Sequence, residues 1–257
     1  METPKKLFLP DGRFILESEL QYLNHGKNAS VWKWSSKDGS FAVKTFYPDC
    51  YRWAIDSKVA DLFMNLDFHN LPNLYSTFRS DEKALKKTFD GYIMEYFEED
   101  VVASLLDLPS NNFYWSIYNL EQDIDLISSH NVVLADVKFE NSMITMDQMF
   151  HLLDYDLFHI DSSKSKDTVH SYNNHEICSF VYLSLIEELY DELDFSDDEK
   201  NRIQYFLKKQ FSSSSFFFEE QSQLSEIKSS DIVGNLFCDD TTPKNSLKKK
   251  VDSLRYF

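Results

Sequence analysis

The feature that most constrains this chain is a polar pattern set between short apolar runs in residues 131–157. Asp136, Lys138 and Asn141 follow the spacing D-x-K-x-x-N, and Asp154 comes thirteen residues after Asn141. A single aspartate means little in a chain where 43 of 257 residues are Asp or Glu. The joint spacing is the informative signal, because it concentrates several polar side chains in one short stretch of apolar strands.

The same stretch is expected to fold as a tight hairpin. Residues 142–145 and 150–153 are short and apolar enough to form two strands, and residues 147–148 supply the turn between them. Such a hairpin would bring Asn141 and Asp154 side by side. Two oxygen ligands fixed in this way suit Mg²⁺, which prefers hard oxygen donors and completes its shell with waters and substrate phosphates.

This pattern resembles the catalytic core of eukaryotic-type protein kinases, in which a loop H-R-D-L-x-x-x-N is followed by a D-F-G triplet. Here residues 134–141 correspond to the loop and residues 154–156 to the triplet. The resemblance implies an α+β fold with two lobes in a single domain over residues 1–257. The N-lobe, about 1–98, would hold an antiparallel β-sheet and one αC helix. The C-lobe, about 99–257, would be mostly helical and reduced in size.

The start of the chain predicts three strands joined by tight turns, as an N-lobe of this kind requires. The strands are expected at residues 14–22, 31–34 and 41–46. The first turn has the form Asn24-x-Gly26-x-x-Ala29-x-Val31, which resembles the family's G-x-G-x-x-G-x-V with one glycine kept. The resemblance implies that Gly26 and Val31 cover a nucleotide, whereas the turn by itself favours an ordinary hairpin.

The third strand carries the lysine that such a site needs. Phe41-Ala42-Val43-Lys44 resembles the family's V-A-I-K strand. The resemblance implies that Lys44 contacts the α and β phosphates of ATP and that Ala42 lines the nucleotide site. A surface lysine on an edge strand is the alternative, but the position after a glycine turn and ahead of the acidic loop favours the functional interpretation.

In the family, this lysine pairs with an acid on helix αC, which we expect here at residues 51–66. The chain has no glutamate between Lys44 and Glu82, so an aspartate would have to serve. Asp56 is favoured by its spacing to the apolar residues that follow, with Asp61 as the alternative. For either residue, a solvated helix face is the other interpretation. The helix is predicted from apolar residues at Ile55, Val59, Leu62, Phe63 and Leu66.

Residues 92–97 resemble the strand that leads into the kinase hinge. In this register Met94 would be the gatekeeper beside the adenine pocket. Glu95 and Phe97 would offer backbone groups to the base, and residues 98–108 would form the hinge itself. A strand of the hydrophobic core would show the same pattern, so the assignment depends on position in the chain.

A long amphipathic helix is predicted at residues 111–129, directly before the loop. His130 at its end is expected to be a capping residue rather than a catalytic histidine. We also expect a charged hairpin at residues 80–87, a capped helix at 196–211 and a basic helical tail that ends the chain. The helix before the loop is predicted from apolar residues at Phe113, Ile117, Leu120, Ile124 and Ile127.

The chain departs from the family at several positions. Leu134 and Ala135 replace the His and Arg of the loop, so we expect activity not to depend on phosphorylation of an activation segment. Asp156 replaces the glycine of D-F-G and would sit near the metal or stiffen the turn. Residues 158–174 are short and polar with no A-P-E, and the next helix would carry Glu176 in its first turn, where the family has Asp.

Together these residues predict an atypical Ser/Thr-type protein kinase that uses ATP and Mg²⁺ to phosphorylate a protein hydroxyl. Asp136 would orient the hydroxyl, Lys138 would stabilise the charge on the transferred group, and Lys44 would hold the phosphates. Asn141 and Asp154 would hold the metal. Two alternatives stay open. The first is a pseudokinase that acts as a nucleotide-binding scaffold, which the lost glycines favour. The second is a small-molecule phosphotransferase of the aminoglycoside type, although such enzymes generally lack the lysine found here at position 138.

Composition restricts the class of partner. The net charge of −17 argues against binding nucleic acid, whose phosphates need a basic surface. Three cysteines without a close pair fit neither a disulfide framework nor a zinc site. No signal-peptide pattern and no run of about 18 apolar residues is present. We therefore expect no membrane span, a cytoplasmic protein or an effector delivered into a host cell, and a protein substrate or regulatory protein as partner.

Overall fold

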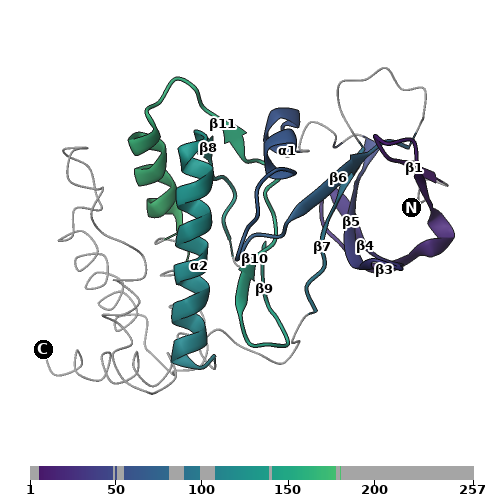
Figure 1. Cartoon of the computed structure of the whole chain (residues 1–257), viewed down its shortest axis with the longest axis horizontal. Coiled ribbons are helices and arrows are strands. Elements are labelled where there is room, and N and C mark those ends of the chain that lie inside the picture. The colour runs from purple at the N-terminus through teal and green to yellow at the C-terminus, as the bar shows by residue number, and fades with distance from the viewer. Residues whose placement is uncertain are drawn as a thin grey trace, which may run out of the picture. The chain divides into compact units, whose positions relative to one another are not determined.

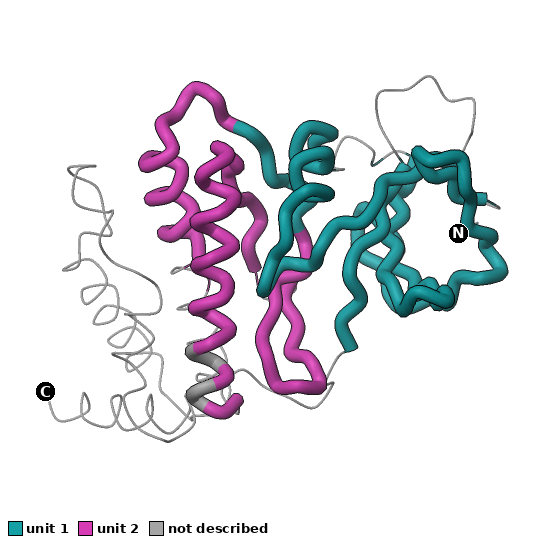
Figure 2. Tube along the Cα trace, viewed as in Figure 1, with its two compact units in different colours: residues 1–98, 155–160 teal, residues 99–154, 161–257 magenta. Residues whose placement is uncertain are grey.

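The computed structural model describes residues 6–48, 50, 55–80, 90–98, 108–138, 141–177 and 180. The chain divides into two compact units (Figure 2). Unit 1 comprises residues 1–98 and 155–160, and unit 2 comprises residues 99–154 and 161–257. The expected hairpin at 80–87, the hinge at 98–108, the helix at 196–211 and the basic tail lie wholly or almost wholly outside the described residues.

A five-stranded antiparallel sheet forms the body of unit 1 (Figure 1). Its strand order is β3-β4-β5-β7-β6, and every neighbouring pair is antiparallel. The expected antiparallel sheet near the start of the chain is therefore confirmed, and the fold is α+β. The strands are β3 (Leu20–His25), β4 (Ala29–Ser36), β5 (Gly39–Phe46), β6 (Leu74–Phe78) and β7 (Gly91–Glu95).

The expected single strand at 14–22 is wrong, because a helical turn interrupts it. β2 (Phe14–Leu16) is followed by the 3-10 turn η1 (Glu17–Glu19), and β3 begins only after that turn. The Glu19 carboxylate accepts a hydrogen bond from the Leu16 backbone N–H at 2.8 Å, which stabilises the bend. β2 instead pairs with β1 (Lys6–Phe8) in a separate two-stranded sheet.

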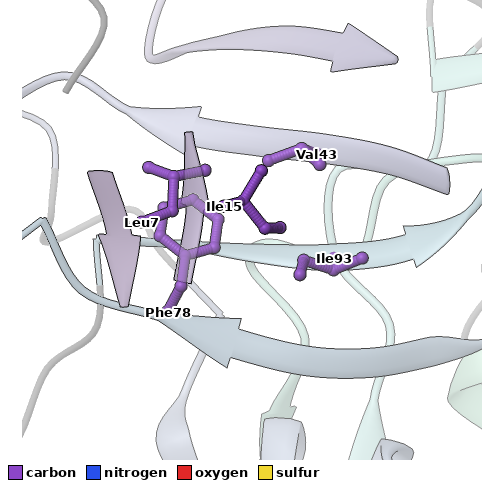
Figure 3. Packing of buried hydrophobic residues seen from close by; sticks show 5 residues of the cluster. All are labelled: Leu7, Ile15, Val43, Phe78 and Ile93. Carbon is purple, nitrogen blue, oxygen red and sulfur yellow. The ribbon is translucent and has the colours of Figure 1, made fainter. Parts of the chain in front are cut away.

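The two faces of the large sheet have different contents. Side chains alternate between the faces along a strand, and residues paired across antiparallel strands share a face. Val43 and Ile93 are paired and point into a hydrophobic core (Figure 3). Lys44 and its partner Tyr92 therefore lie on the opposite face. The core cluster consists of Leu7, Ile15, Val43, Phe78 and Ile93, all at most 3% exposed.

Position 91 admits only glycine, because the backbone of β5 and the Phe78 ring of β6 lie very close to it. It pairs with Thr45 on one side and Phe78 on the other. A methyl group on Gly91 would overlap the backbone oxygen of Lys44 and the ring of Phe78. Only glycine lets β7 lie this close to both neighbours, and β7 also supplies Tyr92 and Met94 to the face opposite the core.

An aromatic cluster joins the short helix α1 (Ser57–Phe63) to residues 155–160 within unit 1. The ring of Phe63 lies 4.9 Å from that of Phe68, 5.3 Å from that of Tyr155 and 6.3 Å from that of Phe158. Residues 155–160, which include β11 (His159–Ile160), thus complete the core of a unit whose other residues lie at 1–98. The helix expected at 51–66 is shorter than predicted, and residues 51–54 lie outside the described residues.

In unit 2, α2 (Ser110–Ser129) confirms the long helix expected before the loop. Its apolar stripe packs against β10 (Phe150–Leu152), and the hydroxyl of Ser116 accepts the backbone N–H of Phe150 at 2.8 Å. His130 occupies the C-cap position, as expected. The strand β8 (Val132–Val133) follows at once. The buried stripe consists of Ile117, Leu120, Ile124 and Ile127, each at most 1% exposed.

The segment after β11 is helical much earlier than predicted. Residues 166–177 and 180 are helical, so most of the second half of the expected polar segment at 158–174 belongs to a helix. Glu176 lies about ten residues into that helix, so the expectation that it stands in the first turn, where the family has Asp, is wrong. Among the described residues, no helix is both long enough and apolar enough to cross a bilayer.

Candidate functional site

The hairpin that carries the polar pattern is confirmed. β9 (Ser142–Ile144) pairs antiparallel with β10 in the register Ser142 to Leu152. Gln148 in the turn has φ 59°, a left-handed conformation that closes the hairpin. One residue beyond the paired strands, the Leu153 N–H donates to the Asn141 carbonyl at 2.8 Å. The hydrogen-bond ladder therefore extends as far as Asn141 and Leu153, and Asp154 is the residue that follows Leu153.

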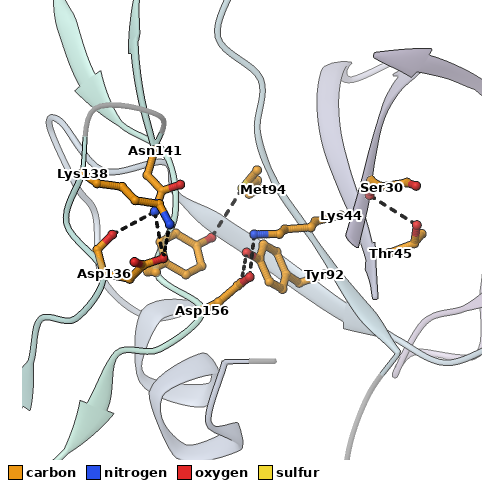
Figure 4. Close-up of polar contacts among 10 residues, drawn as sticks. Ser30, Lys44, Thr45, Tyr92, Met94, Asp136, Lys138, Asn141 and Asp156 are labelled. Atoms are coloured by element: carbon orange, nitrogen blue, oxygen red, sulfur yellow. Dashed lines mark hydrogen bonds and ion pairs between the residues drawn. The ribbon is translucent and has the colours of Figure 1, made fainter. Parts of the chain in front are cut away.

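The loop before the hairpin is closed by its own polar side chains (Figure 4). The Asp136 carboxylate forms an ion pair with Lys138, with Oδ2 and Nζ 2.8 Å apart. Asn141 Nδ2 donates to the backbone oxygen of Asp136 at 2.8 Å and approaches its carboxylate at 3.4 Å. Asp136 itself has φ 57°, a strained conformation of the kind that clusters at functional sites. All three expected residues are brought together.

A residue that the sequence analysis did not single out holds the start of this loop. Asn173, fully buried, accepts the Leu134 N–H at 2.8 Å. Its amide group donates to the Val132 carbonyl at 2.8 Å and to the Ser128 hydroxyl at 2.9 Å. One side chain thus connects the end of α2, β8 and the loop. An asparagine in a polar run is typical of exposed positions, so the sequence carried no signal of this role.

The donor atoms near the hairpin suit a hard divalent cation. Asn141 uses its amide nitrogen toward Asp136, and this directs its amide oxygen away from those bonds. Asp154 adds carboxylate oxygens directly after the hairpin ladder. Among the described residues, no group of three or more His, Cys, Asp and Glu side chains is arranged to hold a metal ion. A pair of oxygen donors fits Mg²⁺, which takes much of its shell from water and phosphate.

Unit 1 holds a second polar cluster, centred on Lys44 (Figure 4). The Lys44 ammonium lies 2.6 Å from Asp156 Oδ2, and the Tyr92 hydroxyl donates to Asp156 Oδ1 at 2.6 Å. Nζ also lies 5.7 Å from the ring centre of Phe46 and 5.9 Å from that of Tyr92. Lys44 is 8% exposed, so the expected alternative of a surface lysine on an edge strand is wrong.

The expected partner of Lys44 has a different function. The Asp56 carboxylate is the N-cap of α1 and accepts the Lys58 N–H at 2.8 Å. Asp61 is exposed on the same helix. The ion pair of Lys44 is made by Asp156, for which we had expected a place near a metal or a stiffening of the turn. The correction has a physical reason: Asp156 reaches Lys44 only because residues 155–160 pack into unit 1.

Several residues expected to contact the nucleotide share a face with Lys44. Val31 pairs with Lys44, and Ala42 pairs with Met94, so all four side chains lie on the face opposite the core. The Tyr155 hydroxyl lies 3.8 Å from the Met94 sulfur. This face thus offers one buried ammonium among small and apolar side chains.

Two residues expected to contact the nucleotide, Glu95 and Gly26, have backbone N–H groups that already form hydrogen bonds within unit 1. The Glu95 N–H donates to the Asn73 carbonyl at 2.8 Å, and its carboxylate accepts the Asn73 amide at 2.9 Å. Phe97, half-buried, follows the end of β7. The Gly26 N–H donates to the Ala29 carbonyl at 2.9 Å. These two amides are used within the sheet and its turn, so the Gly26 turn has the form of an ordinary hairpin.

Two clusters therefore carry the candidate chemistry, one in each unit. The Lys44 cluster of unit 1 consists of Lys44, Tyr92 and Asp156. The Asp136 cluster of unit 2 consists of Asp136, Lys138 and Asn141, with Asp154 next in the hairpin. Comparison with known proteins adds no relative, since no protein-family model and no curated protein matches the chain. The functional conclusion depends on the residues themselves.

Proposed function

We propose that this protein is an atypical phosphotransferase of the protein-kinase type, which uses ATP and Mg²⁺ to phosphorylate a protein hydroxyl. The observation that carries the proposal is the Asp136 cluster. The loop spacing read from the sequence corresponds to a set of side chains bonded to one another, with Asn141 joined by the hairpin ladder to the residue before Asp154.

Phosphoryl transfer depends above all on positioning and on stabilising charge. The Asp136 carboxylate would accept the proton of the attacking hydroxyl, and its ion pair with Lys138 holds it in one orientation. Lys138 would also stabilise negative charge on the transferred group. Asn141 and Asp154 would hold Mg²⁺, which supplies charge neutralisation at the phosphates when bound.

The Lys44 cluster would supply the nucleotide-binding half of the reaction. A lysine held by an acid can present its ammonium to the α and β phosphates in a fixed direction. Val31, Ala42 and Met94 on the same face would give the adenine an apolar surface.

The test is transfer of radiolabelled γ-phosphate to generic protein and small-molecule acceptors. We expect label on a hydroxyl amino acid, and a loss of rate of about 10²-fold or more in Asp136→Asn and in Asp154→Asn. Asp167→Asn, which changes an exposed acid on the helix that begins at 166, is the matched control and should keep full rate. Label that persists in Asp136→Asn would overturn the assigned chemistry.

A nucleotide-binding scaffold is the second candidate, and one observation favours it. The Gly26 N–H is engaged in its own turn, which removes one amide that a phosphate-binding loop would use. A scaffold would be stabilised against heat by Mg²⁺ with ATP but would transfer no label to any acceptor. Label on a small molecule alone would instead assign the chain to the small-molecule phosphotransferases.

A further inference from the structure

The Lys44 cluster contains a charged group that the motif comparison left without a role. Asp156 divides its two oxygens between two donors, with Oδ1 on the Tyr92 hydroxyl and Oδ2 on the Lys44 ammonium, each at 2.6 Å (Figure 4). The side chains of Lys44 and Asp156 are only 10% and 11% exposed. An isolated charge in such a place is strongly unfavourable, so each of these two charged groups stabilises the other.

The backbone on either side of Asp156 is fixed by aromatic packing. Tyr155, fully buried, stacks on Tyr92 with ring centres 5.4 Å apart and meets Phe63 edge-on at 5.3 Å. Phe158, also buried, packs edge-on against both Phe63 and Tyr155, with ring centres 6.3 Å apart in each pair. The carboxylate therefore stands on a rigid support, which is what an accurately placed charged group requires.

We propose that Asp156, oriented by Tyr92, is the residue that positions Lys44 for the phosphates, in place of an acid on helix α1. Asp156 contacts Lys44 and would act through it, so it is a positioning residue. This inference rests on the proposed function for its meaning, but the geometry on which it depends lies wholly in unit 1. Asp56 is engaged as the cap of α1.

Asp156 also lies close along the chain to a proposed metal ligand. Asp156 lies two residues after Asp154, so one short segment would supply both a ligand for the metal and the anchor for the phosphate-binding lysine. The two oxygens of Asp156 also predict a graded response. Loss of the carboxylate removes the ion pair that Asp156 makes with Lys44, whereas loss of the Tyr92 hydroxyl leaves the carboxylate in place but free to rotate.

The test measures how fast a limiting amount of an acylating reagent labels Lys44 in the full chain, by mass spectrometry. Lys164, which pairs with Asp161 in unit 2, is the internal reference. We expect Asp156→Asn to raise labelling of Lys44 about tenfold or more relative to Lys164. Tyr92→Phe should raise the labelling of Lys44 less. Asp156→Glu, which keeps a carboxylate, should give labelling between that of the wild type and that of Asp156→Asn. Asp56→Asn should leave the labelling unchanged. Because the Lys164 side chain is already 41% exposed and that of Lys44 only 10%, unfolding would also raise the labelling of Lys44 relative to Lys164. Each variant is therefore first shown to be folded by a denaturant titration, and Lys164 corrects for the amount of reagent.

Phosphate transfer is then measured on the same variants. We expect kcat/KM for ATP to fall about 10²-fold in Asp156→Asn and to stay unchanged in Asp56→Asn. Unchanged labelling of Lys44 in Asp156→Asn, or raised labelling in Asp56→Asn, would overturn the inference, and so would faster transfer in Asp156→Asn. If the labelling changes as expected but the wild-type chain transfers no phosphate, the role of Asp156 toward Lys44 is supported and only the proposed enzyme activity is refuted.

Discussion

The Lys44–Asp156 pair of unit 1 and the Lys138–Asp136 pair of unit 2 join the same chemical groups at nearly the same distance, 2.6 and 2.8 Å. Their surroundings differ sharply. The first pair has side chains about one-tenth exposed, and the second has side chains 47% and 44% exposed. A buried ion pair supports the fold, whereas an exposed ion pair leaves its charged groups accessible to a substrate. Under the proposed function, the buried pair would position the phosphates and the exposed pair would act on the substrate hydroxyl.

Gly91→Ala gives the largest expected effect, because it acts on the support of the buried pair. The added methyl group would overlap the Lys44 backbone oxygen and the Phe78 ring, so β7 must move away from β5 or β6. We expect unit 1 to lose about 3 kcal/mol or more of unfolding free energy, measured by denaturant titration.

The control for this change is Gly26→Ala. Gly26 lies outside the left-handed region, and an added methyl group there would meet only the Ala29 oxygen at 4.0 Å. Hydrogen exchange in α2 of unit 2 should stay unchanged in Gly91→Ala. Equal destabilisation by both substitutions would show that the close approach at Gly91 is not what limits the sheet.

Lys44→Met and Lys138→Met test the comparison directly. Removing Lys44 leaves the Asp156 carboxylate buried without the Lys44 ammonium, which should cost about 3 kcal/mol of unfolding free energy. Removing Lys138 leaves Asp136 in contact with solvent and should cost under about 1 kcal/mol. Both variants should lose phosphate transfer. Similar stability losses in denaturant titrations of the two variants would contradict the difference in environment.

The Asp136 cluster could be predicted from the sequence, whereas the Lys44 cluster could be predicted only in part. Asp136, Lys138 and Asn141 lie within six residues, so local spacing and a tight hairpin determine their meeting. Asp156 lies 112 residues from Lys44, and their contact depends on Tyr155 and Phe158 packing into unit 1. Spacing carries no information about such packing, and a helix acid was therefore expected in its place.

Asn173→Ala extends the comparison to a neutral group, with a smaller expected effect. The substitution leaves the Leu134 N–H and the Val132 carbonyl without their buried partner, which should cost about 2 kcal/mol. Faster hydrogen exchange should appear in residues 132–138 and at the end of α2. Asn112→Ala is the matched control, since Asn112 makes only a 3.4 Å exposed bond to the Asp147 carbonyl. A loss of stability confined to unit 1 would refute this role.

The smallest expected effect concerns two exposed turns, one in each unit. Hydrogen bonds from the Ser163 hydroxyl and backbone N–H lower the pKa of Asp161 in unit 2, and those from the backbone and side chain of Arg13 lower the pKa of Asp11 in unit 1. A lowered pKa adds stability above the unfolded-state pKa of about 3.9, and this is lost as the pH falls through the folded-state pKa.

We therefore expect Asp161→Asn and Asp11→Asn each to flatten slightly the acid limb of the stability curve, at and below about pH 4, without changing its form near neutrality. Denaturation midpoints across that range measure the effect. Salt should weaken the Asp11 contribution more, because the Asp11 ion pair with Arg13 is short, at 2.7 Å, and solvent-exposed, whereas Asp161 depends mainly on Ser163. If the acid limb of the stability curve is flattened in neither variant, the two carboxylates do not contribute to stability as expected. Equal salt sensitivity of the two contributions would contradict the causes given for the two pKa shifts.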